Sequence, residues 1–472
     1  MRNAKLFVEG RWGSGASTRT LDAVYGSRPV AEIEQASVEQ TRSAIDHLVG
    51  AARDQPLAPD ERRRILARAS VLLADRSPTL REDIVDETGF TLREADAEIK
   101  RACETLRLCA EEAGRLVGEM VPIDGSPSGE GRVAFTIRVP VGVVCAITPF
   151  NSPLNTVCHK VGPALAAGNA VVLKPAPQTP LSANALTEVL LEAGLPATHL
   201  ALVHGDSEEL GGALLEHRDV GFYTFTGSTR VGKIIHQGAG LRRTQLELGS
   251  LASVIVAEDA DIEMAVAKTT AACFRKAGQV CTSVQRAYVH ESVASRFVDT
   301  LLEGLRDAKA GDPRAEDSFI GPLISLDAAE RVEYWVNEAV DGGARLLCGG
   351  GRDGKLFEPT VLTDVDPRMR VMCEEVFGPV MVLRTFTDVD DAIEEANDTP
   401  YGLSAGFFTR RTDLAWRAAR HLRVGAVHIN EASSSRVDLM PFGGVKESGF
   451  GREGPRYAIR EMSEERLVTM RP

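Results

Sequence analysis

The sequence predicts an α/β protein built from two doubly wound parallel-sheet domains and a small additional β element. Short apolar runs typical of buried strands alternate with segments of helical periodicity, which is the pattern of a parallel sheet covered by helices. This alternation occurs twice along the chain. The chain has 472 residues, 43% of them hydrophobic, which is long enough for more than one core.

The first elements of the chain are expected to be helices. From about residue 38 to 118, Leu, Ile, Val and Ala recur at helical spacing between charged residues, which predicts amphipathic surface helices. Pro56, Pro59 and Pro78 mark the breaks between them. Residues 132–138 alternate in polarity as an exposed strand does, and residues 141–147 form a buried one.

Two cycles of strands and helices follow. The first has predicted strands at 170–174, 200–204 and 220–225 and helices at 182–193 and 208–217. The second has predicted strands at 253–256, 287–289, 380–383 and 426–429 and helices at 264–276 and 293–309. No internal repeat or low-complexity linker separates the two cycles, so we expect a compact junction near Glu247.

Composition argues against several kinds of partner. The net charge of −13, with no concentrated run of Lys and Arg, disfavours nucleic acid. No stretch approaches the ~20 apolar residues of a membrane span, and the N-terminus has no secretory apolar run. The eight cysteines include no CxxC pair and are too dispersed for a disulfide framework. We therefore expect a soluble, cytoplasmic protein with reduced cysteines, and we predict no metal site.

Cys281 and Glu247 are the candidate catalytic pair. Cys281 lies in Ala277-Gly278-Gln279-Val280-Cys281-Thr282-Ser283, and Glu247 precedes it in Leu246-Glu247-Leu248-Gly249. A thiolate can add to a carbonyl carbon, and a carboxylate can later activate the water that releases the product. A lone cysteine is more often a small buried hydrophobe, so the interpretation depends on the surrounding motifs.

Two loops after predicted strands provide that context. Thr226-Gly227-Ser228-Thr229-Arg230-Val231-Gly232 opens a predicted helix, where glycine and unpaired amides suit a pyrophosphate, although its glycine spacing departs from the dinucleotide fingerprint. Ile147-Thr148-Pro149-Phe150-Asn151-Ser152-Pro153 follows a buried strand. The Asn151 amide there is a candidate donor to a developing oxyanion, and a simple turn before Pro153 is the alternative.

Three further residues are candidates for cofactor contacts. Lys174 ends a predicted strand, where its ammonium can hold ribose hydroxyls or a phosphate or can simply be solvated. Glu375 and Phe377 lie in Glu374-Glu375-Val376-Phe377-Gly378-Pro379. They can hold a ribose and pack against a flat ring, or they can form an ordinary turn.

Together these segments resemble the aldehyde dehydrogenase superfamily, in order from Phe7-Val8-Glu9-Gly10-Arg11-Trp12 to Pro441-Phe442-Gly443-Gly444-Val445-Lys446-Glu447-Ser448-Gly449. The resemblance implies an NAD(P)-binding domain at 1–119 and 140–246, a catalytic domain at 247–449, and an oligomerisation element at 120–139 and 450–472. The first domain is expected to be Rossmann-like. Family members are usually dimers or tetramers, so we expect a homodimer or homotetramer.

The resemblance also implies a reaction. Cys281 attacks the aldehyde, the Asn151 amide and the Cys281 N–H stabilise the oxyanion, and the resulting thiohemiacetal gives up hydride to the nicotinamide. Water activated by Glu247 then hydrolyses the thioester. Relatives that pass the acyl group to coenzyme A tend to lack this glutamate, so Glu247 favours a free acid. The implied cofactor contacts are Ile147, Thr148, Pro149, Phe150, Lys174, Gly227, Ser228, Glu375 and Phe377.

One departure from the family pattern concerns the cofactor. NAD-preferring relatives often carry a glutamate three residues after the strand-end lysine, where it binds the adenosine ribose, but this chain has Pro177. Proline cannot make that contact, and no carboxylate is left to repel a 2′-phosphate. We therefore expect the enzyme to accept NADP, and we further expect it to prefer NADP over NAD. Arg230 is a candidate to assist NADP binding.

The substrate residues are less clearly marked. Residues 280–286 and 435–441 resemble the branch that includes lactaldehyde, phosphonoacetaldehyde and non-phosphorylating glyceraldehyde-3-phosphate dehydrogenases, which favours small polar aldehydes. Phosphate and phosphonate users often place Arg immediately before the nucleophile, where this chain has Val280. Arg436 and Arg101 are candidates for an anion contact, with loop bracing as the alternative, and Ser152 is a further candidate substrate contact.

Two alternative functions use the same residues. A thiol esterase or acyltransferase would use Cys281 and Glu247 on an activated ester without a redox step, and aldehyde-dependent NAD(P)H formation separates it from a dehydrogenase. A catalytically silent structural or binding protein on the same fold is the other alternative. The presence of Asn151, Glu247 and Cys281 together argues against it.

Overall fold

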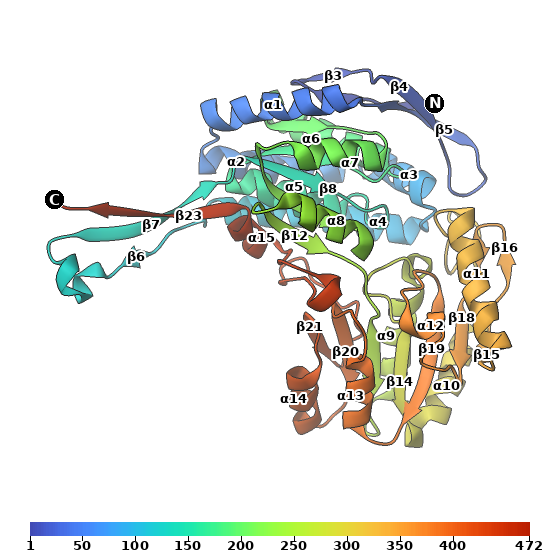
Figure 1. The fold of residues 1–472 in the computed structure, drawn as a ribbon. Helices are drawn as coiled ribbons and strands as arrows, with labels where there is room; N and C mark the ends of the chain where they lie inside the picture. Colours follow the sequence, from blue (N-terminus) through green and yellow to red (C-terminus); the bar gives the residue numbers. More distant parts are fainter.

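The computed structural model describes residues 1–472, and its two parallel α/β sheets confirm the predicted fold class (Figure 1). The first sheet has the strand order β22-β12-β11-β8-β9-β10-β2-β3. Its strands are β2 (Leu6–Val8), β3 (Arg11–Gly13), β8 (Val143–Ile147), β9 (Ala170–Lys174), β10 (Leu200–Leu202), β11 (Val220–Thr226), β12 (Arg243–Glu247) and β22 (Gly449–Phe450). The five strands from β8 to β12 run parallel, so their carboxyl ends share one edge.

Helices cover both faces of the first sheet (Figure 1). They are α1 (Val38–Asp54), α2 (Pro59–Asp75), α3 (Ser77–Thr88), α4 (Leu92–Ala113), α5 (Asn155–Ala167), α6 (Pro180–Glu192), α7 (Ser207–Glu216), α8 (Thr229–Ala239) and α15 (Pro455–Glu461). Their ends follow local chemistry. Ser37 and Thr91 form capping boxes with Gln40 and Glu94, and proline occupies the first turns of α2 and α3.

The second sheet carries the largest single cluster of buried hydrophobic residues, with 48 members. Its order is β15-β18-β19-β14-β13-β20-β21, with only β15 antiparallel. The strands are β13 (Ser253–Val256), β14 (Arg286–His290), β15 (Arg345–Cys348), β18 (Thr360–Thr363), β19 (Val380–Phe386), β20 (Ser404–Phe408) and β21 (Ala426–Ile429). The helices are α9 (Ile262–Phe274), α10 (Glu291–Leu305), α11 (Leu326–Asp341), α12 (Arg370–Cys373), α13 (Val389–Asn397) and α14 (Thr412–His421).

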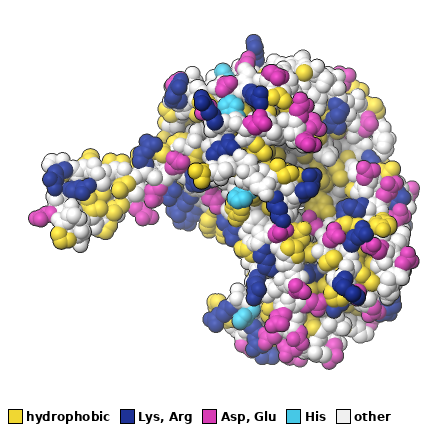
Figure 2. All heavy atoms as spheres, in the orientation of Figure 1, with side chains coloured by type: hydrophobic (Ala, Val, Ile, Leu, Met, Phe, Trp, Pro, Cys, Tyr) yellow, Lys and Arg dark blue, Asp and Glu magenta, His cyan; other side chains and the backbone are white.

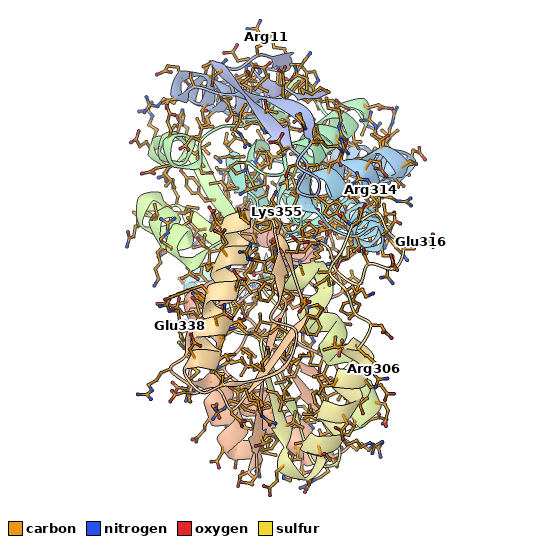
Figure 3. The ribbon with its side chains drawn as sticks, turned by 90° about the vertical axis from the view of Figure 1, so that its right-hand side faces the viewer. Arg11, Arg306, Arg314, Glu316, Glu338 and Lys355 are labelled. Carbon is orange, nitrogen blue, oxygen red and sulfur yellow. The ribbon has the colours of Figure 1, made fainter.

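Charged side chains join the two halves along one side of the molecule (Figure 3). The Arg314 guanidinium donates to the Asp86 carboxylate at 2.6 Å, and the Lys355 ammonium donates to the Val24 carbonyl at 3.0 Å. Asp86 and Val24 belong to the first half of the chain, whereas Arg314 and Lys355 belong to the second. These contacts hold the two sheets as the walls of a common space.

Three smaller sheets complete the fold. A three-stranded sheet of β1 (Arg2–Ala4), β4 (Ser17–Asp22) and β5 (Pro29–Gln35) covers the N-terminal side, and β16 (Arg352–Asp353) pairs with β17 (Leu356–Phe357). A third sheet, of β6 (Met120–Val121), β7 (Val133–Pro140) and β23 (Ser463–Met470), projects as an arm (Figure 1). No helix of the structure combines the length and apolarity that crossing a membrane requires.

One predicted boundary differs from the structure. Residues 450–472 were expected to lie together in the oligomerisation element, but β22 pairs with β12 in the first sheet and α15 packs against α4 and α5. Ile459 and Met462 are buried in the core of that sheet's helices. Only residues 463–470 join the arm, because the hydrophobic side chains before them are used in the first core.

Candidate active site

A cavity of about 1280 Å³ lies between the two sheets, at the carboxyl ends of β8, β9, β11 and β12. This is the edge at which ligands bind in open parallel sheets. Every candidate site residue from the sequence lines it: Arg101, Ile147, Thr148, Pro149, Phe150, Asn151, Ser152, Lys174, Gly227, Ser228, Glu247, Val280, Cys281, Glu375, Phe377 and Arg436. Pro177 and Arg230 line it as well.

Cys281 is presented by a tightly bent loop that follows α9. Lys276, Ala277 and Gly278 all have positive φ (53°, 52° and 70°), and a Cβ on Gly278 would lie 2.0 Å from the Gly378 carbonyl oxygen. Only glycine fits there. Burial, and then the charges of Glu247 and Glu375, raise the pKa of the Cys281 thiol to about 12. The side chain is therefore a thiol at neutral pH.

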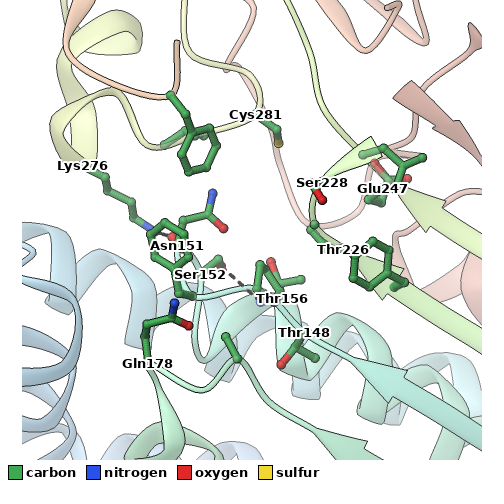
Figure 4. A pocket seen from close by; sticks show the side chains of 18 of the residues that line it. Thr148, Asn151, Ser152, Thr156, Gln178, Thr226, Ser228, Glu247, Lys276 and Cys281 are labelled. Atoms are coloured by element: carbon green, nitrogen blue, oxygen red, sulfur yellow. Dashed lines mark hydrogen bonds between the residues drawn. The ribbon is translucent and has the colours of Figure 1, made fainter. Parts of the chain in front are cut away.

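Glu247 is the last residue of β12, and it lies beside Cys281 in the cavity (Figure 4). It is 2% exposed, and neither carboxylate oxygen has a hydrogen-bond partner. Burial and the neighbouring Glu453 raise the pKa of Glu247 well above its ordinary value. Glu453 itself is paired with Lys160 at 3.0 Å and with Arg436 at 3.0 Å, so those cations are already neutralised. An unpartnered buried carboxyl with a raised pKa has the properties of a general base.

Asn151 lies on the loop after β8, on the opposite side of Cys281 from Glu247 (Figure 4). Its side-chain amide donates to the Gln279 carbonyl at 2.8 Å, which ties this loop to the loop that carries the cysteine. An amide nitrogen carries two N–H groups, so the second remains for another acceptor. Ser152, next to it, donates to the Glu98 carboxylate at 2.6 Å.

The other end of the cavity has features that fit a dinucleotide. The turn between β11 and α8 places Gly227 and Ser228 at a helix N-terminus, where amides and the helix dipole attract a phosphate. The Lys174 side chain is 3% exposed, and its ammonium donates to the Ser207 hydroxyl at 3.1 Å. Burial lowers the pKa of Lys174 to about 8, against the opposing charge of Asp206. No carboxylate forms an ion pair with it, so its charge is available to a ligand.

Glu375 and Phe377 face the cavity near Cys281. The Glu375 carboxylate accepts a hydrogen bond from the Ser250 N–H at 2.9 Å, and burial raises its pKa to about 7. Phe377 has φ 49°, an unfavourable value for a bulky residue, and its ring meets Phe150 edge to face at 5.9 Å. Strain of this kind is concentrated at ligand sites.

Comparison with known proteins accounts for this arrangement. Residues 13–468 match the model of the aldehyde dehydrogenase family. The chain belongs to that family. It is an enzyme of aldehyde oxidation that uses NAD(P). The aldehyde oxidation expected from the sequence is therefore confirmed, and it is favoured over a thiol esterase and over a catalytically silent protein.

Individual relatives in the family cover nearly the whole chain. A 3-sulfolactaldehyde dehydrogenase of Priestia aryabhattai is 47% identical over 98% of this chain and 97% of its own. Aldehyde dehydrogenase 21 of Physcomitrella patens, solved with its product succinate, has a TM-score of 0.97 at 34% identity, with 100% and 98% coverage. NADP-dependent glyceraldehyde-3-phosphate dehydrogenase of Bacillus halodurans C-125, complexed with NADP, has a TM-score of 0.97 at 35% identity. The match covers 100% of this chain and 99% of that enzyme.

The two arginines expected from the sequence to meet the substrate are already paired. Arg101 makes a two-point contact with Asp438, at 2.7 and 3.2 Å. Arg436 pairs with Glu453 and lies over the Phe442 ring at 3.9 Å. Both line the cavity, but protein carboxylates offset their charges. Loop bracing, the alternative considered from the sequence, therefore describes their contacts.

Arg275 is one of the cavity cations that sequence reasoning missed. It lies at the end of α9, lines the cavity, and makes no ion pair or side-chain hydrogen bond. Burial, and then the charge of Arg101, lower its pKa. The nearest carboxylates, Glu94 and Glu98, are bonded elsewhere. The only sequence signal was a pair of cations, Arg275 and Lys276, directly after the apolar residues 271–274.

Proposed function

We propose that this enzyme oxidises a small anionic aldehyde to the free carboxylic acid through a covalent Cys281 thioester. The observation that carries the proposal is the placement of the Cys281 thiol in one cavity between the Asn151 amide and the unpartnered carboxyl of Glu247. Arg275 lines the same cavity and forms no ion pair, which supports an anionic substrate.

In the proposed reaction, the Cys281 thiol gives its proton to solvent water, and Sγ then adds to the aldehyde carbon. The remaining N–H of the Asn151 amide and the Cys281 backbone N–H stabilise the oxyanion of the thiohemiacetal. Loss of hydride leaves a thioester. Glu247 then takes a proton from the water that attacks this thioester, which releases the acid and regenerates Cys281. A carboxyl whose pKa is raised by burial is suited to that proton transfer.

The residues that would hold NAD(P) divide the cavity into two ends. Gly227, Ser228 and Lys174 would meet the phosphates and a ribose, and Glu375 and Phe377 would hold the nicotinamide half, beside the 147–150 segment. When bound, NAD(P)+ supplies the hydride acceptor. We further propose that NADP is accepted and preferred, since Pro177 lines the cavity where a ribose-binding carboxylate would exclude a 2′-phosphate.

Arg275 supports a substrate with a small negatively charged group. A buried guanidinium without a carboxylate partner favours a ligand that neutralises it, and its planar donors suit carboxylate, sulfonate or phosphonate oxygens. The relatives agree with that chemistry, because one is named for a sulfonated aldehyde and another was solved with succinate. Val280 leaves the position before the nucleophile without a charge, so Arg275 takes the role first considered for Arg101 and Arg436.

We propose a homodimer or homotetramer that works in the cytoplasm. The projecting arm supports assembly, and the eight free cysteines suit a reducing compartment. The partner of the enzyme is its small-molecule substrate. We propose no nucleic-acid or membrane partner.

A steady-state screen of small aldehydes against NAD and NADP tests the function. We expect aldehyde-dependent NAD(P)H formation that is fastest with aldehydes bearing a carboxylate or sulfonate. The Cys281→Ala variant should lose at least about a thousandfold in kcat, because no other nucleophile lies beside the Asn151 amide. A Cys281→Ala variant with full activity, or ester turnover without any aldehyde oxidation by the wild type, would overturn the assignment.

A further inference from the structure

A buried ion pair between Glu98 and Lys276 joins three segments around the nucleophile. The Lys276 ammonium donates to the Glu98 carboxylate at 2.9 Å and to the backbone carbonyl of Asn151 at 2.8 Å. The Lys276 side chain is 11% exposed, and the Glu98 side chain is 2% exposed. Glu98 belongs to α4, Asn151 to the loop after β8 and Lys276 to the loop that presents Cys281. Figure 4 shows Lys276 reaching toward Asn151 from that loop.

Each partner of the pair is held by further contacts. Glu98 also accepts hydrogen bonds from the Ser152 hydroxyl at 2.6 Å and from the Asn155 N–H at 2.9 Å. Burial alone would raise the pKa of Glu98, but the Lys276 charge and these hydrogen bonds lower it to about 2. The Lys276 ammonium in addition lies over the Phe90 ring, at 4.6 Å. The pair is thus charged on both sides and fully partnered.

The backbone at Lys276 is strained, and the pair explains why the strain persists. A non-glycine residue at φ 53° is unusual, and Asn tolerates that region better than Lys. Local strain of this type survives only where surrounding contacts fix the conformation. The buried charge of Lys276, held by Glu98 and the Asn151 carbonyl, supplies such contacts.

We propose that Lys276 is a positioning residue that sets the Asn151 amide against Cys281. Two links connect the loops in opposite directions: the Lys276 ammonium binds the Asn151 carbonyl, and the Asn151 amide binds the Gln279 carbonyl. Without the first link, Asn151 is fixed to the cysteine loop only through the amide that the oxyanion needs. The inference rests on the proposed role of Asn151 and goes beyond it by naming the residue that holds it in place.

The test uses two reactions of the full-length enzyme that need neither aldehyde nor cofactor. In the first, Cys281 Sγ displaces nitrophenolate from p-nitrophenyl acetate and water then hydrolyses the acetyl thioester, which requires oxyanion stabilisation. In the second, Sγ displaces iodide from iodoacetamide at a saturated carbon, where no oxyanion forms. The variants are Lys276→Asn, Lys276→Met and Glu98→Gln. Lys268→Met is the matched control, because Lys268 pairs with Glu431 on α9 away from the cavity lining.

We expect both Lys276 variants to lower kcat for ester hydrolysis by about 10- to 100-fold, less than the roughly 100- to 1000-fold cost of removing an oxyanion donor, while KM stays within about threefold. The alkylation rate should change by less than about threefold, because the thiol and its access are retained. Glu98→Gln should show the same split, and Lys268→Met should resemble the wild type. Lys276→Asn is the second variant, because Asn tolerates the positive φ at this position, so the test survives if Lys276→Met fails to fold.

Unchanged ester hydrolysis in Lys276→Asn would overturn the proposal. A parallel fall of alkylation and ester hydrolysis would also overturn it, because that result places the effect on Cys281 itself. Cys281→Ala sets the background rate for both reactions. Wild-type enzyme that hydrolyses the ester but oxidises no aldehyde would contradict the proposed function and leave this comparison intact.

Discussion

At the residue scale, three of the arginines that line the cavity differ in what offsets their charge. Asp438 neutralises Arg101 and Glu453 neutralises Arg436, whereas Arg275 has no such partner. We therefore expect Arg275→Met to raise KM for succinate semialdehyde by about 30- to 100-fold, the value of a charge-assisted hydrogen bond lost from a buried site. Propanal has no anionic group, so the KM for propanal should change by less than about threefold in the same steady-state assay.

Equal losses for both aldehydes would contradict a contact with the anion. Arg345→Met serves as the control, because Arg345 is exposed on β15, pairs with Asp364 and does not line the cavity.

Pro177 gives a prediction about the cofactor. It lines the cavity close to the strand-end Lys174, and its carbonyl accepts a hydrogen bond from Arg19 at 2.6 Å. Pro177→Glu places a carboxylate where a 2′-phosphate is expected, so Kd for NADP should rise by at least about tenfold while Kd for NAD changes little. Fluorescence titration of the purified protein measures both constants. Pro127→Glu, the same change in the exposed arm, should alter neither, and an equal effect on the two cofactors would argue against this placement.

The half-buried Cys281 thiol gives a pH prediction. Because burial and neighbouring carboxylates raise its pKa to about 12, the thiolate fraction is small at neutral pH and grows as pH rises. Iodoacetamide alkylation of Cys281 in the protein without cofactor should therefore accelerate by about tenfold per unit between pH 7 and 10. Mass spectrometry of the peptide that contains Cys281 measures the rate, with exposed Cys373 as an internal comparison. A plateau below pH 8 would contradict the raised pKa.

Residues of the site were predictable to the extent that their motifs lie after strands. Gly227, Lys174 and Asn151 follow buried strands, whose shared carboxyl edge brings them together. The ion pair between Arg101 and Asp438 joins residues far apart in the chain, so no local sequence pattern predicts it. Arg275 is conspicuous only through the contacts that it lacks, which become visible once the fold is known.

At the element scale, strands were predicted where a continuous run of apolar residues marks a buried strand. The runs 170–174 and 253–256 coincide with β9 and β13, because Val, Ile and Leu follow one another there without polar interruption. The run 426–429 coincides with β21 although His428 lies among its apolar residues. β20 was missed although all five of its residues are buried, since Ser404-Ala405-Gly406-Phe407-Phe408 has no strong β-branched signal. β12 was missed because Arg243, Thr244 and Gln245 are polar.

The turn between β11 and α8 carries the element-scale prediction. A Cβ on Gly227 would lie 2.4 Å from the Phe225 ring, so alanine must displace that ring or shift the helix N-terminus. We expect Gly227→Ala to weaken NADP binding by at least about tenfold, because amides at a helix N-terminus hold a phosphate only at close approach. Gly304→Ala in α10 meets no atom within 4 Å and should leave binding unchanged while adding about 0.5–1 kcal/mol of stability. Wild-type affinity in Gly227→Ala would rule out this turn as the phosphate site.

At the scale of the whole molecule, the arm is the feature that the single chain leaves incomplete. It projects from the body, and its outer strand β23 is an uncovered edge of eight residues (Figure 1). The pairing of β7 with β6 and β23 puts Met120, Val133, Phe135, Ile137, Val468 and Met470 on one face. Figure 2 shows hydrophobic side chains gathered on the arm. A face of this kind favours burial against a second copy of the chain.

We therefore expect the variant that combines Ile137→Glu and Met470→Glu to shift the protein toward a 50.8 kDa monomer in light scattering after size-exclusion chromatography. Two buried carboxylates at an apolar interface cost several kcal/mol, which is enough to dissociate a dimer at micromolar concentration. Trp416→Glu, at an exposed site on α14, should leave the mass unchanged. Since the cavity is lined within one chain, the monomer should still bind NADP, and an unaltered oligomer mass would move the assembly contact away from this face.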